Sequence, residues 1–209
     1  MVKKNFEVNM KIFKENSYDI VRLYVNQLGI MIFSMLLYTA VGSFENQALS
    51  TALSIFVSVF SVCFYLVLVY YAMWEIGAKD KIRIDGNRME PCERKGVVMG
   101  LFANVPNFVL GLLTVIFTAL VLIFGKNGIL VSLVGIFNLI TRFHASMYLG
   151  IISEIVPHSL PVGEVDYVEF LIEAILFTVL PLASVGVTHL GYYLGSKEKK
   201  IFSFLTNKK

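Results

Sequence analysis

The side chains most able to do chemistry in this sequence are the few charged and polar groups inside long apolar runs. Arg142 interrupts the apolar run over residues 127–155. A cation at the centre of a bilayer costs at least about 2.5 kcal/mol on insertion scales, so it marks a functional site by default. Two structural alternatives stay open: the side chain snorkels to a membrane interface, or it pairs with Glu154, Glu169 or Glu173. The functional alternative is contact with an anionic substrate.

Two glutamates and two histidines extend the set of candidates for a substrate or ion pathway. Glu169 and Glu173 are four residues apart, so on a helix they share a face that can accept a proton or contact a cation. The alternative is that they complement the positive end of the helix dipole. His144 and His189 can relay protons, or they can hydrogen-bond across a helix interface. No histidine stands at metal-ligand spacing beside the glutamates, and we expect neither a metal nor a cofactor.

Asn104 and Asn107 flank Pro106 inside the apolar run over residues 96–125. A proline within a helix removes one backbone donor and kinks the helix. Many transporters build their central binding site from such a broken helix and nearby polar groups. Both asparagines therefore join the predicted pathway, with a simple packing kink as the alternative. Pro181 is expected to kink the last apolar run in the same way.

Motifs of soluble enzymes are missing from the sequence. It has no phosphate-binding glycine loop, no HExxH pair, no serine nucleophile elbow and no Cys-x-x-Cys. We assign no catalytic residue, and the sequence excludes a soluble-type enzyme. An enzyme embedded in the membrane, with His144 or His189 as the base, stays a hypothesis.

The elements that must position these side chains are membrane helices. The chain is 56% hydrophobic and 16% charged, whereas soluble domains carry roughly 25% charge. A bilayer core about 30 Å thick needs about 20 helical residues. We predict an all-α, polytopic integral membrane helical bundle that forms one domain over residues 1–209. It has five membrane segments, or six crossings or half-crossings, at about residues 20–44, 48–76, 96–125, 127–155 and 167–196.

The last of these helices has a recognisable start. Asp166, followed by Glu169 three residues later, matches a capping box, in which side chains satisfy the first amide groups of a helix. The pattern predicts that the helix begins at Asp166.

The positions of the basic residues predict the orientation of the chain, but they leave open whether the fourth segment crosses the membrane once or folds back. They place the amino terminus and the loop over residues 77–95 in the cytoplasm of a cell membrane. If the last two segments each cross once, a tail with five lysines lies outside, against this rule. If residues 127–155 fold back as two half-helices with Arg142 and His144 near the tip, the tail lies inside. Against this second topology, no Gly or Pro stands where such a hairpin would turn. Both topologies stay open.

The loop over residues 77–95 is the longest charged insertion between segments. Its basic residues predict contact with a cytoplasmic partner, such as the ATPase of a transporter, or with lipid headgroups. They are Lys79, Lys81, Arg83, Arg88, Arg94 and Lys95. All 18 Lys and Arg residues are confined to short segments, a distribution that reflects topology, so no nucleic-acid partner is expected. The lipid bilayer is the expected partner, and the oligomeric state stays open.

These features together favour a transport or permease-type component that moves a small solute or ion. Two alternatives stay open: an accessory or scaffold protein that acts through its cytoplasmic loop, and the membrane-embedded enzyme. The sequence specifies neither the substrate nor the partner.

Overall fold

The computed structural model of the chain describes residues 2–156 and 166–199. All regular structure in these residues is helical, as the sequence predicts. Four stretches are long and apolar enough to cross a membrane: Ser17–Gly42, Gln47–Asp85, Val105–Phe124 and Tyr167–Ser196. A bent pair, Gly128–His144 with Ser146–Ile155, adds a fifth if it is counted as one span.

The chain divides into two compact units. Unit 1 comprises Met1–Asn26, Leu66–Asn104 and Leu182–Lys209, and unit 2 comprises Gln27–Tyr65 and Val105–Pro181. Helices α2 (Ser17–Gly42) and α3 (Gln47–Asp85) each contribute residues to both units.

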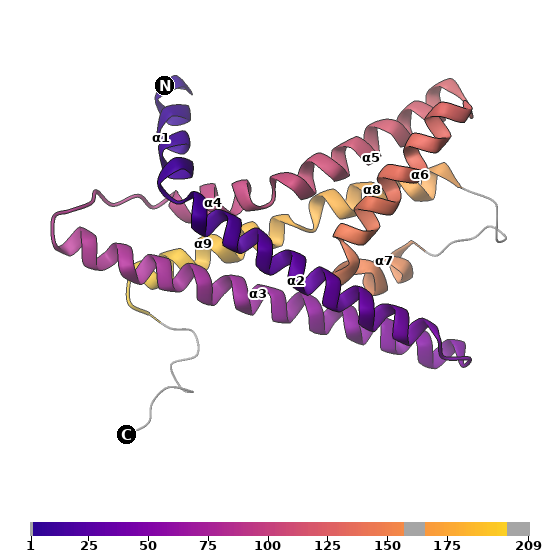
Figure 1. Cartoon of the computed structure of the whole chain (residues 1–209), viewed down its shortest axis with the longest axis horizontal. Coiled ribbons are helices and arrows are strands. Elements are labelled where there is room, and N and C mark those ends of the chain that lie inside the picture. The colour runs from indigo at the N-terminus through magenta and orange to yellow at the C-terminus, as the bar shows by residue number, and fades with distance from the viewer. Residues whose placement is uncertain (1, 157–165, 200–209) are drawn as a thin grey trace. The chain divides into compact units, whose positions relative to one another are not determined.

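Unit 1 also contains α1 (Val2–Glu15), α4 (Lys95–Ala103) and α9 (Leu182–Ser196). Helix α4 packs against α9, and α1 contacts α4, as Figure 1 shows. The rings of Phe13 and Phe102 lie 4.8 Å apart at the contact between α1 and α4. Helix α1 lies before the first predicted membrane segment and was not expected from the sequence.

Glycines let the helices of unit 1 approach closely. A Cβ atom added to Gly100 of α4 would lie 2.1 Å from Oγ1 of Thr188 on α9. A Cβ atom added to Gly195 of α9 would lie 2.1 Å from the carbonyl oxygen of Trp74 on α3. These separations are shorter than any van der Waals contact, so only glycine permits this packing.

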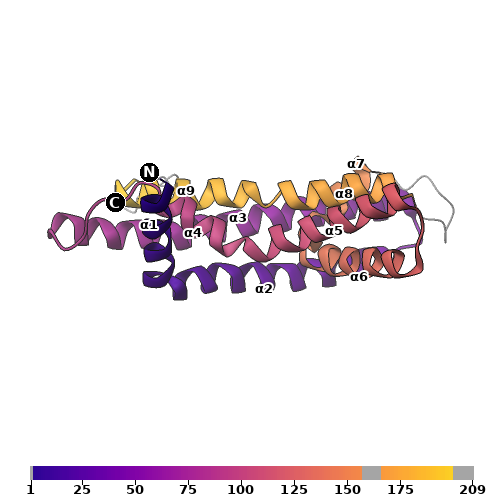
Figure 2. The ribbon, with the colours of Figure 1, turned by 90° about the horizontal axis from the view of Figure 1, so that it is seen from above.

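Unit 2 contains α5 (Val105–Phe124), α6 (Gly128–His144), the 3-10 turn η1 (Ser146–Tyr148), α7 (Leu149–Ile155) and α8 (Tyr167–Val179). Helix α5 packs against both α6 and α8, and Figure 2 shows α6 running beside α5. Val121, Val134 and Tyr167 form a buried cluster that joins the end of α5 to the starts of α6 and α8. This cluster fixes the three helices at one end of unit 2.

Side-chain caps define where α6 and α8 begin. Asp166 accepts a hydrogen bond from the backbone amide of Val168 at 2.7 Å, which confirms the predicted helix start. Asn127 accepts from the amide of Ile129 at 3.0 Å and caps α6 in the same way.

The fourth apolar segment is broken at Ala145, and its two parts are bent by 76°. No Gly or Pro stands at this turn, and tertiary contacts hold it in place. The Ser146 hydroxyl donates to the carbonyl of Met31 at 2.6 Å, and the amide of Gly150 donates to the Ser58 hydroxyl at 2.7 Å. The contact with Ser58 of α3 therefore satisfies the Gly150 amide, which a continuous helix would satisfy within itself, and the contact with Met31 ties the turn to α2.

The charged segment after the second apolar run is more ordered than the sequence indicates. Helix α3 continues through Asp85, so its last turns occupy the first half of the expected loop over residues 77–95. Lys79 pairs with Glu75 at 2.7 Å, and Lys81 pairs with Asp85. Such pairs four residues apart stabilise a helix where the apolar pattern has ended.

Candidate functional site

Arg142 forms an ion pair with Glu173 inside unit 2. Its Nη2 atom lies 2.5 Å from Oε2 of Glu173, and its Nε atom donates to Oδ1 of Asn138 at 3.2 Å. The guanidinium carbon lies 5.6 Å from the centre of the Phe170 ring. The side chain of Glu173 is 4% exposed and that of Arg142 is 32% exposed, so the acid is buried and the base reaches it from the surface of the unit.

Helix geometry places these four side chains together. Asn138 and Arg142 are one turn apart on α6, while Phe170 and Glu173 are one turn apart on α8, and the two helices are in contact. Glu173 is one of the three glutamates that the sequence offered as partners of Arg142, and it forms an ion pair with it. Glu169 lies one turn earlier on α8 and is partly exposed.

Unit 2 also contains a small cavity. Its volume is about 10 Å³, and its polar lining comes from Gln27, Asn107, Thr141, His144 and Tyr148. This volume is about that of one water-sized probe. The predicted pathway residues Asn107 and His144 therefore meet here, beside Thr141, the neighbour of Arg142 in the chain.

Helix interruptions surround this cavity. Ala145, where α6 ends, and Pro181, which follows the end of α8, both line it. Asn107 lies in the first turn of α5, just after the break at Asn104. The predicted kinks near Pro106 and Pro181 are confirmed as breaks in the helices, and the break at Ala145 has no sequence signal.

Thr114 and Thr141 were missed by sequence reasoning. Their hydroxyl oxygens lie 2.8 Å apart at the contact between α5 and α6, and both residues are buried. Isolated threonines in apolar runs are common, so only the tertiary pairing distinguishes these two.

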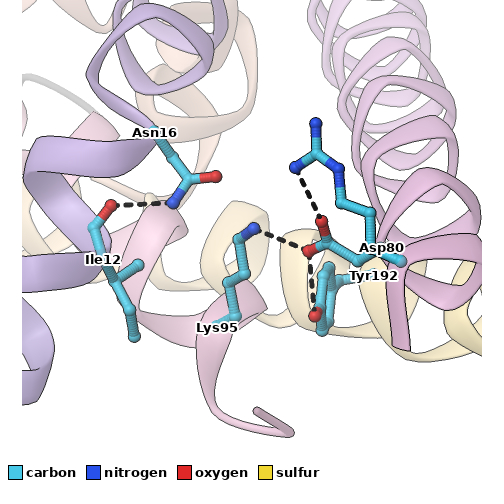
Figure 3. A network of polar contacts seen from close by, with 6 residues as sticks. Ile12, Asn16, Asp80, Lys95 and Tyr192 are labelled. Carbon is cyan, nitrogen blue, oxygen red and sulfur yellow. Dashed lines mark hydrogen bonds and ion pairs between the residues drawn. The ribbon is translucent and has the colours of Figure 1, made fainter. Parts of the chain in front are cut away.

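Unit 1 contains a buried ion pair of its own, which Figure 3 shows. Nζ of Lys95, at the start of α4, lies 2.6 Å from Oδ2 of Asp80 on α3, and the Tyr192 hydroxyl donates to the same oxygen at 3.2 Å. Asp80 is 1% exposed and Lys95 is 3% exposed. Lys95 was predicted to be a partner-contact residue, but its ammonium group lies in the interior of unit 1. No spacing rule links residues 80 and 95, so the sequence carried no signal for this pair.

The other predicted pathway residues in unit 1 take part in helix packing. Nδ2 of Asn104 donates to the carbonyl of Gly100 and to the hydroxyl of Ser184, both at 2.9 Å, so this residue ends α4 and ties it to α9. The Cα atom of His189 would lie 2.8 Å from a Cβ atom on Gly96. Nδ1 of His189 is buried and has no hydrogen-bond partner within the described part of the chain.

The remaining basic residues of the loop line or border a groove of unit 1. Arg83 and Arg88, together with Lys11 of α1 and Glu90, line a groove of about 730 Å³. Arg94 precedes α4 and is exposed. Contact of these residues with a partner stays a prediction.

Neither a metal site in the described residues nor a matching protein assigns a role to these side chains. Within residues 2–156 and 166–199, no three His, Cys, Asp or Glu side chains gather where they could hold a metal ion. Comparisons with protein-family models, with curated proteins and with solved structures found no match to this chain.

Proposed function

We propose that this chain is a small multi-pass membrane protein of transport or permease type, which moves a small solute or ion through unit 2. The observation that carries the proposal is the Arg142–Glu173 pair, held between two apolar helices. Ionisable groups inside membrane segments pair with one another and mark ion or substrate pathways. The neighbouring cavity, which five polar residues help to line and interrupted helices border, supports the same role because transporters bind substrates at broken helices.

The exposed apolar surface supports insertion in a bilayer. In the most apolar window of each candidate span, only 28–33% of the residues are buried. Phe56, Phe60 and Phe64 stack along one face of α3 and are 65%, 45% and 44% exposed. Water would disfavour so large an apolar face, whereas lipid tails accommodate it.

We infer that both termini and the loop over residues 86–94 face the cytoplasm of a cell membrane. Unit 1 contains every Lys and Arg of the chain except Lys126 and Arg142, as the positive-inside rule requires of one cytoplasmic end. The indole N–H of Trp74 donates to the carbonyl of Lys199 at 2.7 Å, so the end of α9 lies beside the aromatic end of the apolar part of α3. The tail and the loop then share one side of the membrane.

This orientation favours a re-entrant fourth segment. The end of α5 and the start of α8 pack in one cluster, so the chain between them leaves and returns at one end of unit 2. The 76° bend at Ala145 supports a fold-back of α6, η1 and α7 over a single straight crossing. Arg142 then lies near the tip of the re-entrant element.

Neutralising Arg142 tests the transport proposal. Purified protein in proteoliposomes is screened by solid-supported membrane electrometry against concentration jumps of H⁺, Na⁺, K⁺, Cl⁻ and small organic anions. Arg142→Gln is expected to abolish the current that the unmodified protein gives, because it removes the charge from the pathway and leaves Glu173 buried. The matched control is Lys126→Gln, which removes one positive charge from the turn between α5 and α6.

The amount of folded protein in the membrane separates mechanism from structure. Equal amounts of the Arg142→Gln and Lys126→Gln variants, with current lost only in the first, support the proposal. Loss of protein in parallel with loss of current assigns Arg142 a structural role. A screen in which the unmodified protein carries no current for any solute contradicts the transport function.

The groove in unit 1 favours the accessory or scaffold function as a second candidate. Its exposed cations, Lys11, Arg83 and Arg88, together with a volume of about 730 Å³, suit an acidic segment of a cytoplasmic partner. In cells, a photo-crosslinking amino acid at Met89 is expected to trap one discrete partner. Under this function Arg88→Glu abolishes the crosslinked species and Arg142→Gln has no effect.

A further inference from the structure

Four buried hydroxyls of unit 2 have no hydrogen-bond partner within the described part of the chain: those of Ser34, Ser61, Thr118 and Tyr148. Among these four residues, Tyr148 is the one that lines the cavity. Tyr148 is 3% exposed, and its hydroxyl oxygen forms no hydrogen bond within the described part of the chain. A buried hydroxyl without a hydrogen bond costs about 1–3 kcal/mol on the scale of protein mutations. Such groups in native structures are usually paired with protein or with ordered water.

Tyr148 lines the cavity described above, and a backbone carbonyl there also lacks its usual partner. Pro181 has no N–H, so the carbonyl of Phe177, four residues earlier, does not receive the amide hydrogen bond that a helix would supply. Phe177 and Pro181 both line the same cavity as Tyr148. The break between α8 and α9 therefore contributes the Phe177 carbonyl as an acceptor, and the turn after α6 contributes the Tyr148 hydroxyl to the same cavity.

The size and lining of the cavity restrict its occupant. A volume of about 10 Å³ is about the least that holds one water molecule. The amide groups of Gln27 and Asn107 and the hydroxyl of Thr141 add polar atoms to the lining. No carboxylate lines the cavity, so it has no formal negative charge to hold a strongly hydrated cation.

We propose that this cavity is a binding site for one water molecule, which donates to the Phe177 carbonyl and hydrogen-bonds to the Tyr148 hydroxyl. The water satisfies both groups at once and lies beside His144, so it links the breaks at Ala145 and Pro181. Its role as the innermost polar step of the pathway rests on the transport function proposed above. The binding site itself does not depend on that function.

The decisive experiment is a structure of the full chain in lipid nanodiscs, at a resolution that shows ordered water. It is expected to contain a density peak within hydrogen-bonding distance of Oη of Tyr148 and of the Phe177 carbonyl. Tyr148→Phe removes the hydroxyl and is expected to lose the peak. An empty cavity, or a Tyr148 hydroxyl bonded directly to protein, overturns the proposal, as does a peak with the short contacts of a bound Na⁺ ion.

Hydroxyl-radical footprinting gives a second measurement on the unmodified protein. Radicals generated from a bound water attack the nearest side chain, so Tyr148 is expected to be modified several-fold faster than Tyr70, which is 5% exposed in unit 1. Equal, slow modification of both tyrosines contradicts the water site.

The two proposals fail in different ways. A water peak in a protein that carries no current leaves the binding site intact and removes the transport function. A current carried by a protein with a dry cavity removes the water site and leaves the transport function.

Discussion

Removing Lys95 gives the sharpest test of how unit 1 is held together. In Lys95→Met, the carboxylate of Asp80 stays buried without its ammonium partner. Truncating one side of a buried ion pair costs about 3–5 kcal/mol, because an uncompensated charge is left in the interior. The Tyr192 hydroxyl stays bonded to Asp80, and the exposed guanidinium of Arg83 lies 3.6 Å away, so we expect the lower end, about 3 kcal/mol.

This loss is measurable as a shift in the unfolding temperature. For a chain of 150–250 residues, 1 kcal/mol corresponds to about 2–4 °C, so Lys95→Met is expected to lower Tm by about 6–12 °C. The only tryptophan of the chain, Trp74, belongs to unit 1. Its fluorescence during heating in detergent micelles therefore reports on the unit that contains the pair.

Two further variants make the test specific. Lys79→Met removes a lysine whose side chain is 62% exposed in its pair with Glu75, and should cost no more than about 0.5 kcal/mol. Asp80→Asn combined with Lys95→Met removes both charges and is expected to recover most of the loss. A Lys95→Met shift no larger than that of Lys79→Met refutes the reasoning. So does a double variant less stable than Lys95→Met.

Two further predictions concern helix packing and topology. Gly195→Ala is expected to destabilise unit 1 by about 1–3 kcal/mol, because the added methyl group clashes with the backbone of Trp74. Gly186→Ala on the same helix meets open space and should be neutral or stabilising. Heating curves followed by Trp74 fluorescence compare the two variants, and equal shifts in Tm would contradict the packing. A cysteine placed at Asn207, after Cys63 and Cys92 are changed to serine, should react with an impermeant maleimide only from the cytoplasmic side. Labelling from the outside would instead require residues 128–155 to cross the membrane once.

The positions of most helices were predictable because they depend on local properties of the chain. Apolar runs of about 20 residues and charged boundaries predicted helices close to those observed at 17–42, 105–124 and 167–196. The Asp166 cap and the interruption at Pro181 follow from the chemistry of single side chains, which acts within one turn of a helix.

The sequence by itself also indicated that Arg142 is costly in hydrocarbon. It offered Glu154, Glu169 and Glu173 as possible ion-pair partners of this side chain. Only the tertiary structure shows that Glu173 forms an ion pair with Arg142, because this contact depends on which face of α8 meets α6. The Asp80–Lys95 pair and the turn at Ala145 had no sequence signal at all. Each depends on groups from helices far apart in the chain, Tyr192 in the first case and Met31 and Ser58 in the second, and such contacts exist only once the helices have packed.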